Sequence, residues 1–174
     1  MESRKLTSIV ASPGGPKPRR NIVAGEPVKW RVIVLGALLR PWFARGMFQG
    51  MGVLGTVGRK TSKLRRHSVR AIREGAKVYI VSIPGPHALW VWNIRANPRV
   101  QVELGGAGIE GTAHELAEGP EREEARAVFV GTVNRVDYIE CFIHWRGMPA
   151  RWKIQRLHEM WFDGGIPVRI DLDS

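Results

Sequence analysis

Residues 52–83 read GVLGTVGRKTSKLRRHSVRAIREGAKVYIVSI and contain three strand-like runs in succession. The runs at 52–57 and 77–83 are short, rich in β-branched residues and bounded by turn residues, which is typical of β-strands. Between them, residues 65–73 alternate, with Val69 and Ala71 on one face and Arg70 on the other. The pair Glu74-Gly75 is typical of a hairpin turn. This stretch therefore predicts consecutive antiparallel strands.

The rest of the chain adds further strands with helices between them. Residues 100–104 and 109–115 predict a hairpin around a glycine-rich turn, and residues 166–172 predict a final strand. Helices are expected at residues 88–97, 120–133, 138–145 and 150–162. This order favours an α+β domain built on an antiparallel β-barrel with peripheral helices over a doubly wound α/β sheet. No dinucleotide-binding or P-loop motif follows a strand.

The N-terminal region divides into a tail and an apolar segment. Residues 1–27 combine prolines and glycines with basic residues, which predicts a flexible basic tail and leaves residues 28–174 as one domain. Residues 28–50 are expected to form an amphipathic helical segment, with a break or kink at Pro41 followed by a second short helix. Two interpretations stay open: a helix that closes one end of the core, or a peripheral membrane contact through residues 28–48.

Basic residues are concentrated in one stretch of the chain. The net charge is +11, and seven of the fifteen residues from 59 to 73 are basic while none is acidic. The stretch opens with residues 56–62, a glycine-containing turn rich in hydroxyl groups, which suits the oxygens of a phosphate or carboxylate. Charge alone leaves open a nucleic acid, a membrane surface and an anionic cofactor as the partner.

Composition narrows the class of protein. A chain of 174 residues with 44% hydrophobic residues is suited to one domain with a proper core. The lone cysteine, Cys141, cannot form an internal disulfide, which favours a reducing cytoplasm. No signal peptide and no metal site are expected, since no His/Cys cluster has the spacing of zinc ligands.

Three segments, in order, resemble the deazaflavin-dependent nitroreductase family of actinobacterial oxidoreductases. They are residues 56–61 with Arg65 after them, residues 78–82, and the string Trp-x-x-Asn-x-x-Ala-Asn-Pro at residues 90–98. The resemblance implies an FMN-binding split-barrel-like fold, often dimeric. It also implies that the chain binds the 8-hydroxy-5-deazaflavin coenzyme F-420 and uses its reduced form as a hydride donor.

The resemblance also implies where the coenzyme binds. Its phosphate and glutamate tail is expected at the basic turn, and its ring at the loop that follows Ser82. The expected coenzyme-binding residues are Thr56, Gly58, Arg59, Lys60, Thr61, Ser62, Arg65, Ser82, Ile83, Pro84, Gly85, His87 and Trp90. Ser82 and Tyr138 are the expected catalytic residues, as donors to a growing oxyanion. Asn93 and Trp92 are expected to be structural, and Arg66, Arg70 and Arg73 to form a solvated strand face.

The sequence departs from the family pattern at several positions. Ser62 stands where many relatives have glycine, and the loop from Ser82 to Trp90 is about two residues shorter than usual, with Pro84 and Pro86 in it. The C-terminal region is longer and rich in tryptophan, and Tyr138 is the tyrosine available there for a substrate pocket.

The function expected is a deazaflavin-dependent reductase that passes hydride to a quinone, enone or nitro compound. It would be a cytoplasmic homodimer that binds a small-molecule acceptor and no nucleic acid, with the inner face of the membrane as a second location. Two alternatives remain: a flavin- or heme-binding split-barrel protein, and a basic nucleic-acid-binding protein without enzyme activity. The tryptophans cluster in the C-terminal half, away from the basic hairpin, which argues against the nucleic-acid alternative.

Overall fold

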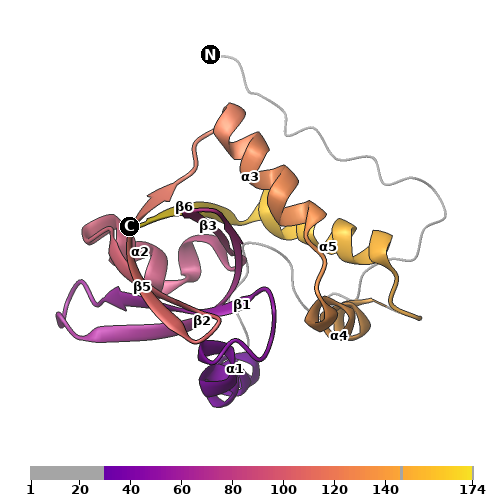
Figure 1. The fold of residues 1–174 in the computed structure, drawn as a ribbon, viewed down its shortest axis with the longest axis horizontal. Helices are drawn as coiled ribbons and strands as arrows, with labels where there is room; N and C mark the ends of the chain where they lie inside the picture. The colour runs from indigo at the N-terminus through magenta and orange to yellow at the C-terminus, as the bar shows by residue number, and fades with distance from the viewer. Residues whose placement is uncertain (1–29, 146, 174) are drawn as a thin grey trace.

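The fold is a closed antiparallel β-barrel with helices around it (Figure 1). The structure, a computed structural model, describes residues 30–145 and 147–173. The six strands of the barrel follow one another in the order β1-β2-β3-β6-β5-β4, and β1 pairs with β4 to close it. The strands are β1 Met51–Val57, β2 Leu64–Glu74, β3 Lys77–Ser82, β4 Arg99–Leu104, β5 Ala107–Glu115 and β6 Ile166–Leu172. The predicted α+β split-barrel class is confirmed; the predicted tail at 1–27 lies outside the described residues.

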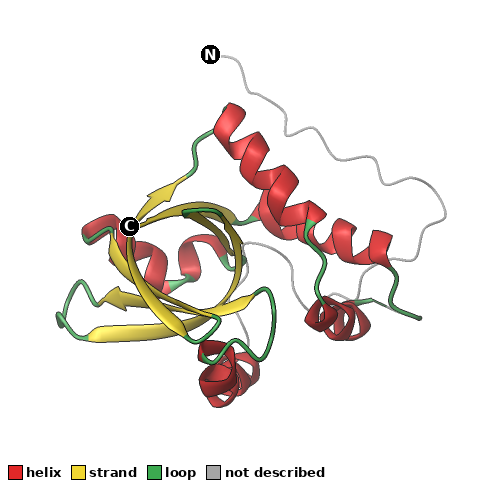
Figure 2. Ribbon diagram, viewed as in Figure 1, coloured by secondary structure: helices red, strands yellow, loops and turns green. Residues whose placement is uncertain are grey.

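The helices fall into an inner and an outer group (Figure 2). They are α1 Trp30–Ala44, α2 Leu89–Ala96, α3 Pro120–Gly131, α4 Arg135–His144 and α5 Arg151–Gly164, with a short 3-10 turn, η1, at Gly85–His87. Helix α2 contributes Trp90, Val91 and Ile94 to the cluster of apolar side chains inside the barrel, so it closes one opening. The other helices lie outside the strands.

Alternation along the strands separates two cores. Val69 and Ala71 of β2 point into the barrel, where they meet residues such as Leu54 and Ile80. Ile72 points outward into a second cluster, where Tyr79, Val81, Phe129 and Phe162 also pack. That second cluster lies between the barrel and helices α3 and α5. A third joins α4 to α5, and its members are Cys141, Trp145, Ile154, Leu157 and Trp161.

Helix α1 differs from its prediction. It runs without interruption from Trp30 to Ala44 with Pro41 inside it, so the expected second short helix is wrong. Proline removes one N–H donor and disfavours the preceding turn, yet Pro41 is exposed and the helix ends within one turn of it. Among the described side chains of α1, Val34, Leu38 and Trp42 are exposed, so its outer side is apolar over these residues. Within the described residues, no helix is long and apolar enough to cross a membrane.

Candidate active site

The turn between β1 and β2 is held in a tight conformation by its own backbone. The Gly58 N–H donates to the Lys63 carbonyl at 2.9 Å, and the Ser62 N–H donates to the Gly58 carbonyl at 2.8 Å. A Cβ added to Gly58 would lie 3.0 Å from the Thr61 hydroxyl oxygen, so glycine fits closely here. Ser62 has φ of 52°, in the left-handed region that favours glycine. A glycine would therefore adopt the backbone conformation of this position with less strain than serine.

Four exposed cations surround this turn. They are Arg59, Lys60, Lys63 and Arg65, and none of them takes part in an ion pair with another described residue. The basic residues further along β2 behave differently. The Arg66 guanidinium lies 2.6 Å from a Glu103 carboxylate oxygen, and the Arg73 Nε donates to the Gly75 carbonyl. Among the described residues, positive charge is thus left uncompensated at the turn, while it is partly neutralised along the strand.

Asn93 of α2 fixes the turn to the barrel. Its buried side chain accepts the Arg59 backbone N–H at 3.2 Å and donates to the Thr56 hydroxyl at 3.0 Å. Thr56 is fully buried at the end of β1. The structural role expected for Asn93 is therefore one of positioning the residues that carry the cations.

Trp92 connects the turn with the loop after β3. The guanidinium carbon of Arg59 lies 5.8 Å from the centroid of the indole ring, and that of Arg95 lies 5.0 Å from it. The Trp92 Nε1 donates to the Pro86 carbonyl at 2.7 Å. Trp92 is 42% exposed, so it forms part of the surface of the site. The structural role expected for Trp92 is therefore one of packing at the surface, against Arg59 and Arg95, and not in the core.

The loop after β3 is shaped by Ser82. The buried Ser82 hydroxyl donates to the Gly85 carbonyl at 2.8 Å, and Gly85 has φ of 58°. Ile83 packs against the cluster between α4 and α5, so the loop borders those helices. Trp90 is buried in the barrel core beneath the loop. Thr56, Ser82 and Trp90 thus form the buried support of the site, while Arg59, Lys60, Thr61, Ser62 and Arg65 are on its surface.

Tyr138 lies on a different element from the other expected site residues. It is in α4, its side chain is 41% exposed, and its hydroxyl makes no hydrogen bond to a described residue. Ile83 links the loop to this part of the molecule, because it packs against the cluster that joins α4 to α5.

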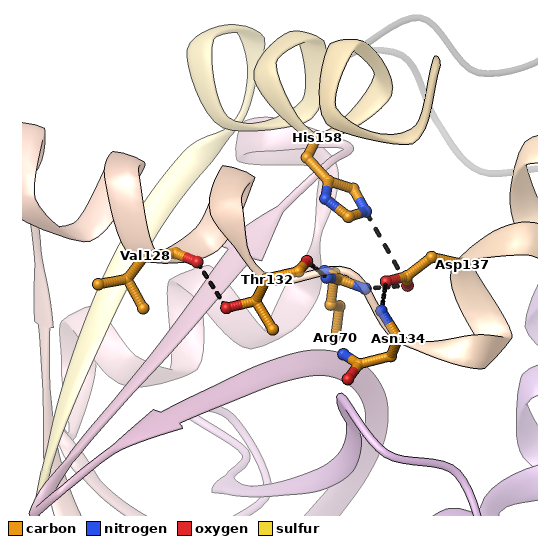
Figure 3. Close-up of polar contacts among 6 residues, drawn as sticks. All are labelled: Arg70, Val128, Thr132, Asn134, Asp137 and His158. Carbon is orange, nitrogen blue, oxygen red and sulfur yellow. Dashed lines mark hydrogen bonds and ion pairs between the residues drawn. The ribbon is translucent and has the colours of Figure 1, made fainter. Parts of the chain in front are cut away.

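A buried polar cluster, which the sequence analysis missed, fastens α4 to the barrel (Figure 3). Arg70 forms an ion pair with Asp137, and its other terminal nitrogen donates to the Thr132 carbonyl at 2.8 Å. Asp137 also accepts the Asn134 backbone N–H at 2.6 Å, in the capping box of α4. The expectation that Arg70 belongs to a solvated strand face is therefore wrong. No local sequence signal marks it, because its partner is 67 residues away.

Burial shifts two titratable groups beside this ion pair. Burial, with a smaller contribution from the positive charge of Arg70, lowers the pKa of His158 to about 3. Burial raises the pKa of Glu140 to about 7, against an opposing contribution from Arg70. The groups of this cluster contact one another in the interior. The role of the cluster is therefore structural: it holds α4 against the barrel.

A family model of F420H(2)-dependent quinone reductase matches residues 44–140, more than half of the chain. The chain belongs to this family. The match spans the basic turn, the Ser82 loop and α2. As a member of the F420H(2)-dependent quinone reductase family, the chain is an oxidoreductase that depends on the reduced deazaflavin coenzyme, and the resemblance seen in the sequence is confirmed.

One solved structure agrees with this assignment, and a second shares the fold. The chain is similar to an F420-H2 dependent reductase, FDR-A, with a TM-score of 0.51 and 26% identity over 72% of this chain and 95% of that one. A second structure, a domain-swapped dimer, has a TM-score of 0.50 and 24% identity over 83% of this chain and 97% of that one, which shows the fold alone.

The residues of the turn fit the coenzyme that this family requires. The turn offers four cations that have no ion-pair partner within residues 30–145 and 147–173, a backbone that approaches closely at Gly58, and hydroxyls at Thr61 and Ser62. These groups suit a phosphate followed by carboxylates. The sequence left open a flavin, a heme or a nucleic acid as the ligand. Membership of this family favours the deazaflavin coenzyme over all three.

Proposed function

We propose that this chain transfers hydride from the reduced deazaflavin coenzyme to a quinone, and that enones and nitro compounds are further acceptors. The observation that supports this is the basic turn, whose four cations have no ion-pair partner among the described residues and whose backbone is fixed by Asn93. A rigid, uncompensated cationic surface is a receptor for a polyanionic coenzyme tail.

In the proposed binding mode, the cations and the hydroxyl groups of the turn bind the phosphate and the carboxylates of the coenzyme. Arg59, Lys60 and Arg65 contact the phosphate and the nearest carboxylates, and Lys63 adds a fourth cation. Thr61 and Ser62 donate hydroxyl hydrogen bonds to the same oxygens. When bound, the coenzyme supplies the hydride. Because Asn93 holds the Arg59 backbone, it sets where these donors stand before the ligand arrives.

The ring of the coenzyme is proposed to lie against the loop after β3. Ile83, Pro84, Gly85 and His87 would border it, with the buried Trp90 beneath. Hydride transfer requires the two reacting carbons to be held together with water excluded, and this apolar, proline-containing loop is suited to that.

Ser82 and Tyr138 remain the proposed donors to the oxyanion that develops on the acceptor. The Ser82 hydroxyl would have to turn away from the Gly85 carbonyl to do this. Tyr138 is 41% exposed and its hydroxyl makes no hydrogen bond to a described residue, so it needs no such exchange.

A homodimer in the cytoplasm, with a peripheral membrane contact through residues 28–48, is proposed for the assembly and location of the enzyme. The dimer rests on the family resemblance, and the membrane contact on the exposed apolar side chains of α1. Sedimentation of the purified protein tests the first of these proposals.

Coenzyme titration of charge variants tests the site. Trp92 lies against Arg59, so its fluorescence should report binding at the turn. Arg59→Ala and Lys60→Ala should each weaken coenzyme binding about tenfold, since a hydrogen bond to a charged group is worth about 1.5–3 kcal/mol. Arg73→Ala is the matched control, because Arg73 lies at the other end of β2. Equal affinities for all three variants and the parent, or binding of FMN or heme alone, would refute the proposal.

A further inference from the structure

Helix α2 places two neighbouring residues against Arg59, one against its backbone and one against its side chain. The Asn93 side-chain oxygen accepts the Arg59 backbone N–H at 3.2 Å. The guanidinium carbon of Arg59 lies 5.8 Å from the centroid of the Trp92 ring, a distance at which a cation is attracted to an aromatic face. Asn93 therefore positions the backbone of this residue, and Trp92 contacts the group that carries its charge.

The same tryptophan is also bound to the loop after β3. The Trp92 Nε1 donates to the Pro86 carbonyl at 2.7 Å, at the short end of the range for such a bond. Pro86 lies within η1, Gly85–His87, in the part of the loop proposed to border the coenzyme ring. One indole thus contacts a cation of the proposed tail site and the backbone of the proposed ring site.

The indole is restrained from β5 by Arg95. The guanidinium carbon of Arg95 lies 5.0 Å from the centroid of the Trp92 ring. Its Nε and Nη2 donate to the two carboxylate oxygens of Glu115, at 2.6 and 2.9 Å. A bidentate pair of this kind fixes the orientation of a guanidinium as well as its position. Arg59 has no such pair within the described residues, so it is the contact of the indole that changes when an anion binds.

We propose that Trp92 is a positioning residue that couples binding of the coenzyme tail to the conformation of the loop that borders the ring. An anion bound by Arg59 fixes the guanidinium, and the fixed guanidinium restricts movement of the indole against which it packs. The restricted indole holds the Pro86 carbonyl, and η1 with it, in one place.

The consequence of this coupling is that the tail contributes to the rate of hydride transfer as well as to affinity. Binding energy from a remote part of a ligand can be used to orient its reacting part, and hydride transfer depends closely on that orientation. The inference rests on the proposed function, because it takes the basic turn as the tail site and the loop after β3 as the ring site. It adds a role for a residue of α2 that contacts both.

Two deazaflavins distinguish coupling from a purely structural role. One is the reduced coenzyme, and the other is the same reduced ring without the phosphate and the glutamates. The rate of hydride transfer to duroquinone is measured in single turnovers at saturating deazaflavin, and the dissociation constants are measured by calorimetry. Hydrogen exchange of the His87 and Ala88 amides, which donate to the Pro84 and Gly85 carbonyls, reports the order of η1 without any turnover.

Three variants of the full chain are compared with the parent. Trp92→Phe keeps an aromatic ring against Arg59 and lacks the N–H donor, whereas Trp92→Leu lacks both. Trp152→Phe is the matched control, because Trp152 is an exposed tryptophan of α5 that has Lys153 against its ring. Thermal unfolding of each variant shows whether it is folded.

With the coenzyme, Trp92→Phe should transfer hydride about five- to tenfold more slowly than the parent, the usual net effect of one hydrogen bond. Its dissociation constant should rise by about twofold at most, whereas Trp92→Leu should also bind about threefold more weakly because the cation has lost the ring. With the tail-less ring, Trp92→Phe and the parent should have nearly equal rates. The coenzyme should slow exchange in η1 of the parent more than the tail-less ring does, and this difference should disappear in Trp92→Phe. Trp152→Phe should behave as the parent in every measurement.

Equal losses of rate with both deazaflavins would show that Trp92 orders the loop without regard to the tail, and would overturn the proposal. Unchanged rates and exchange in a folded Trp92→Phe protein would overturn it as well. A parent that binds the coenzyme and shows the exchange difference, yet does not reduce the quinone, would refute the proposed function and leave the coupling standing. A parent that does not bind the coenzyme would overturn both.

Discussion

Replacement of Asp137 by alanine should lower the free energy of unfolding by about 3–5 kcal/mol, the usual cost of removing one partner from a buried ion pair. The side chain of Arg70 is 5% exposed and that of Asp137 is 0% exposed, so the guanidinium would keep its charge in the interior without a counterion. Removal of the carboxylate also breaks the capping box of α4, which contributes to the same loss. The Thr132 carbonyl and the face of the Phe129 ring, 5.3 Å from the guanidinium carbon, remain to compensate in part.

Urea unfolding, followed by both tryptophan fluorescence and circular dichroism, measures this effect. Asp163→Ala provides the matched control, since Asp163 forms an exposed ion pair with Arg126 and should cost about 0–1 kcal/mol. The double variant Arg70→Met/Asp137→Leu should recover most of the stability, because apolar replacements of a buried pair remove the desolvation cost of both charges. A loss below about 1 kcal/mol for Asp137→Ala would show that water reaches Arg70, and the reasoning from burial would fail.

Three further predictions concern the turn and the buried histidine. Asn93→Ala should weaken coenzyme binding about tenfold by freeing the Arg59 backbone and the Thr56 hydroxyl; a titration that shows full affinity in a folded variant contradicts the positioning role. Ser62→Gly should raise the free energy of unfolding by up to about 1 kcal/mol in urea, because glycine relieves the left-handed conformation, and a loss of stability would count against this strain. The pKa of His158 is lowered to about 3 in the folded protein, so the unfolded chain takes up the proton first and stability falls as the pH drops from about 6.5 towards 3. A His158→Phe variant should lose less stability over that interval, and an unchanged acid profile would show that His158 does not contribute.

The barrel could be predicted largely from local patterns in the sequence. The final strand was expected at 166–172 and is found at Ile166–Leu172, because it is a short apolar run that follows two glycines. Local patterns were less useful for α1, since a proline near a helix end costs less than one in its middle. The local patterns predicted a separate short helix after Pro41, whereas α1 continues through Pro41 to Ala44.

The polar contacts of the site required the fold. Asn93 meets Thr56 and Arg59, which lie 37 and 34 residues before it, and no periodicity within α2 signals those partners. The same reason explains Arg70, whose alternating strand gives it the pattern of an outward-facing residue. It does face out of the barrel, but the side it faces is covered by α3 to α5, and only the tertiary arrangement shows that.

The position of β6 bears on how the protein reaches its native state. This last strand lies between β3 and β5. Its pairing with β3 therefore joins residues that are far apart in the sequence, such as Lys77 and Asp171. During synthesis β3 and β5 emerge well before their common neighbour, and each exposes an unpaired edge until residues 166–172 have left the ribosome. Such edges are sites of aggregation, and pairings between distant segments form slowly. The slow step of folding should therefore be the insertion of β6, and chains shortened before residue 166 should aggregate instead of forming a smaller barrel.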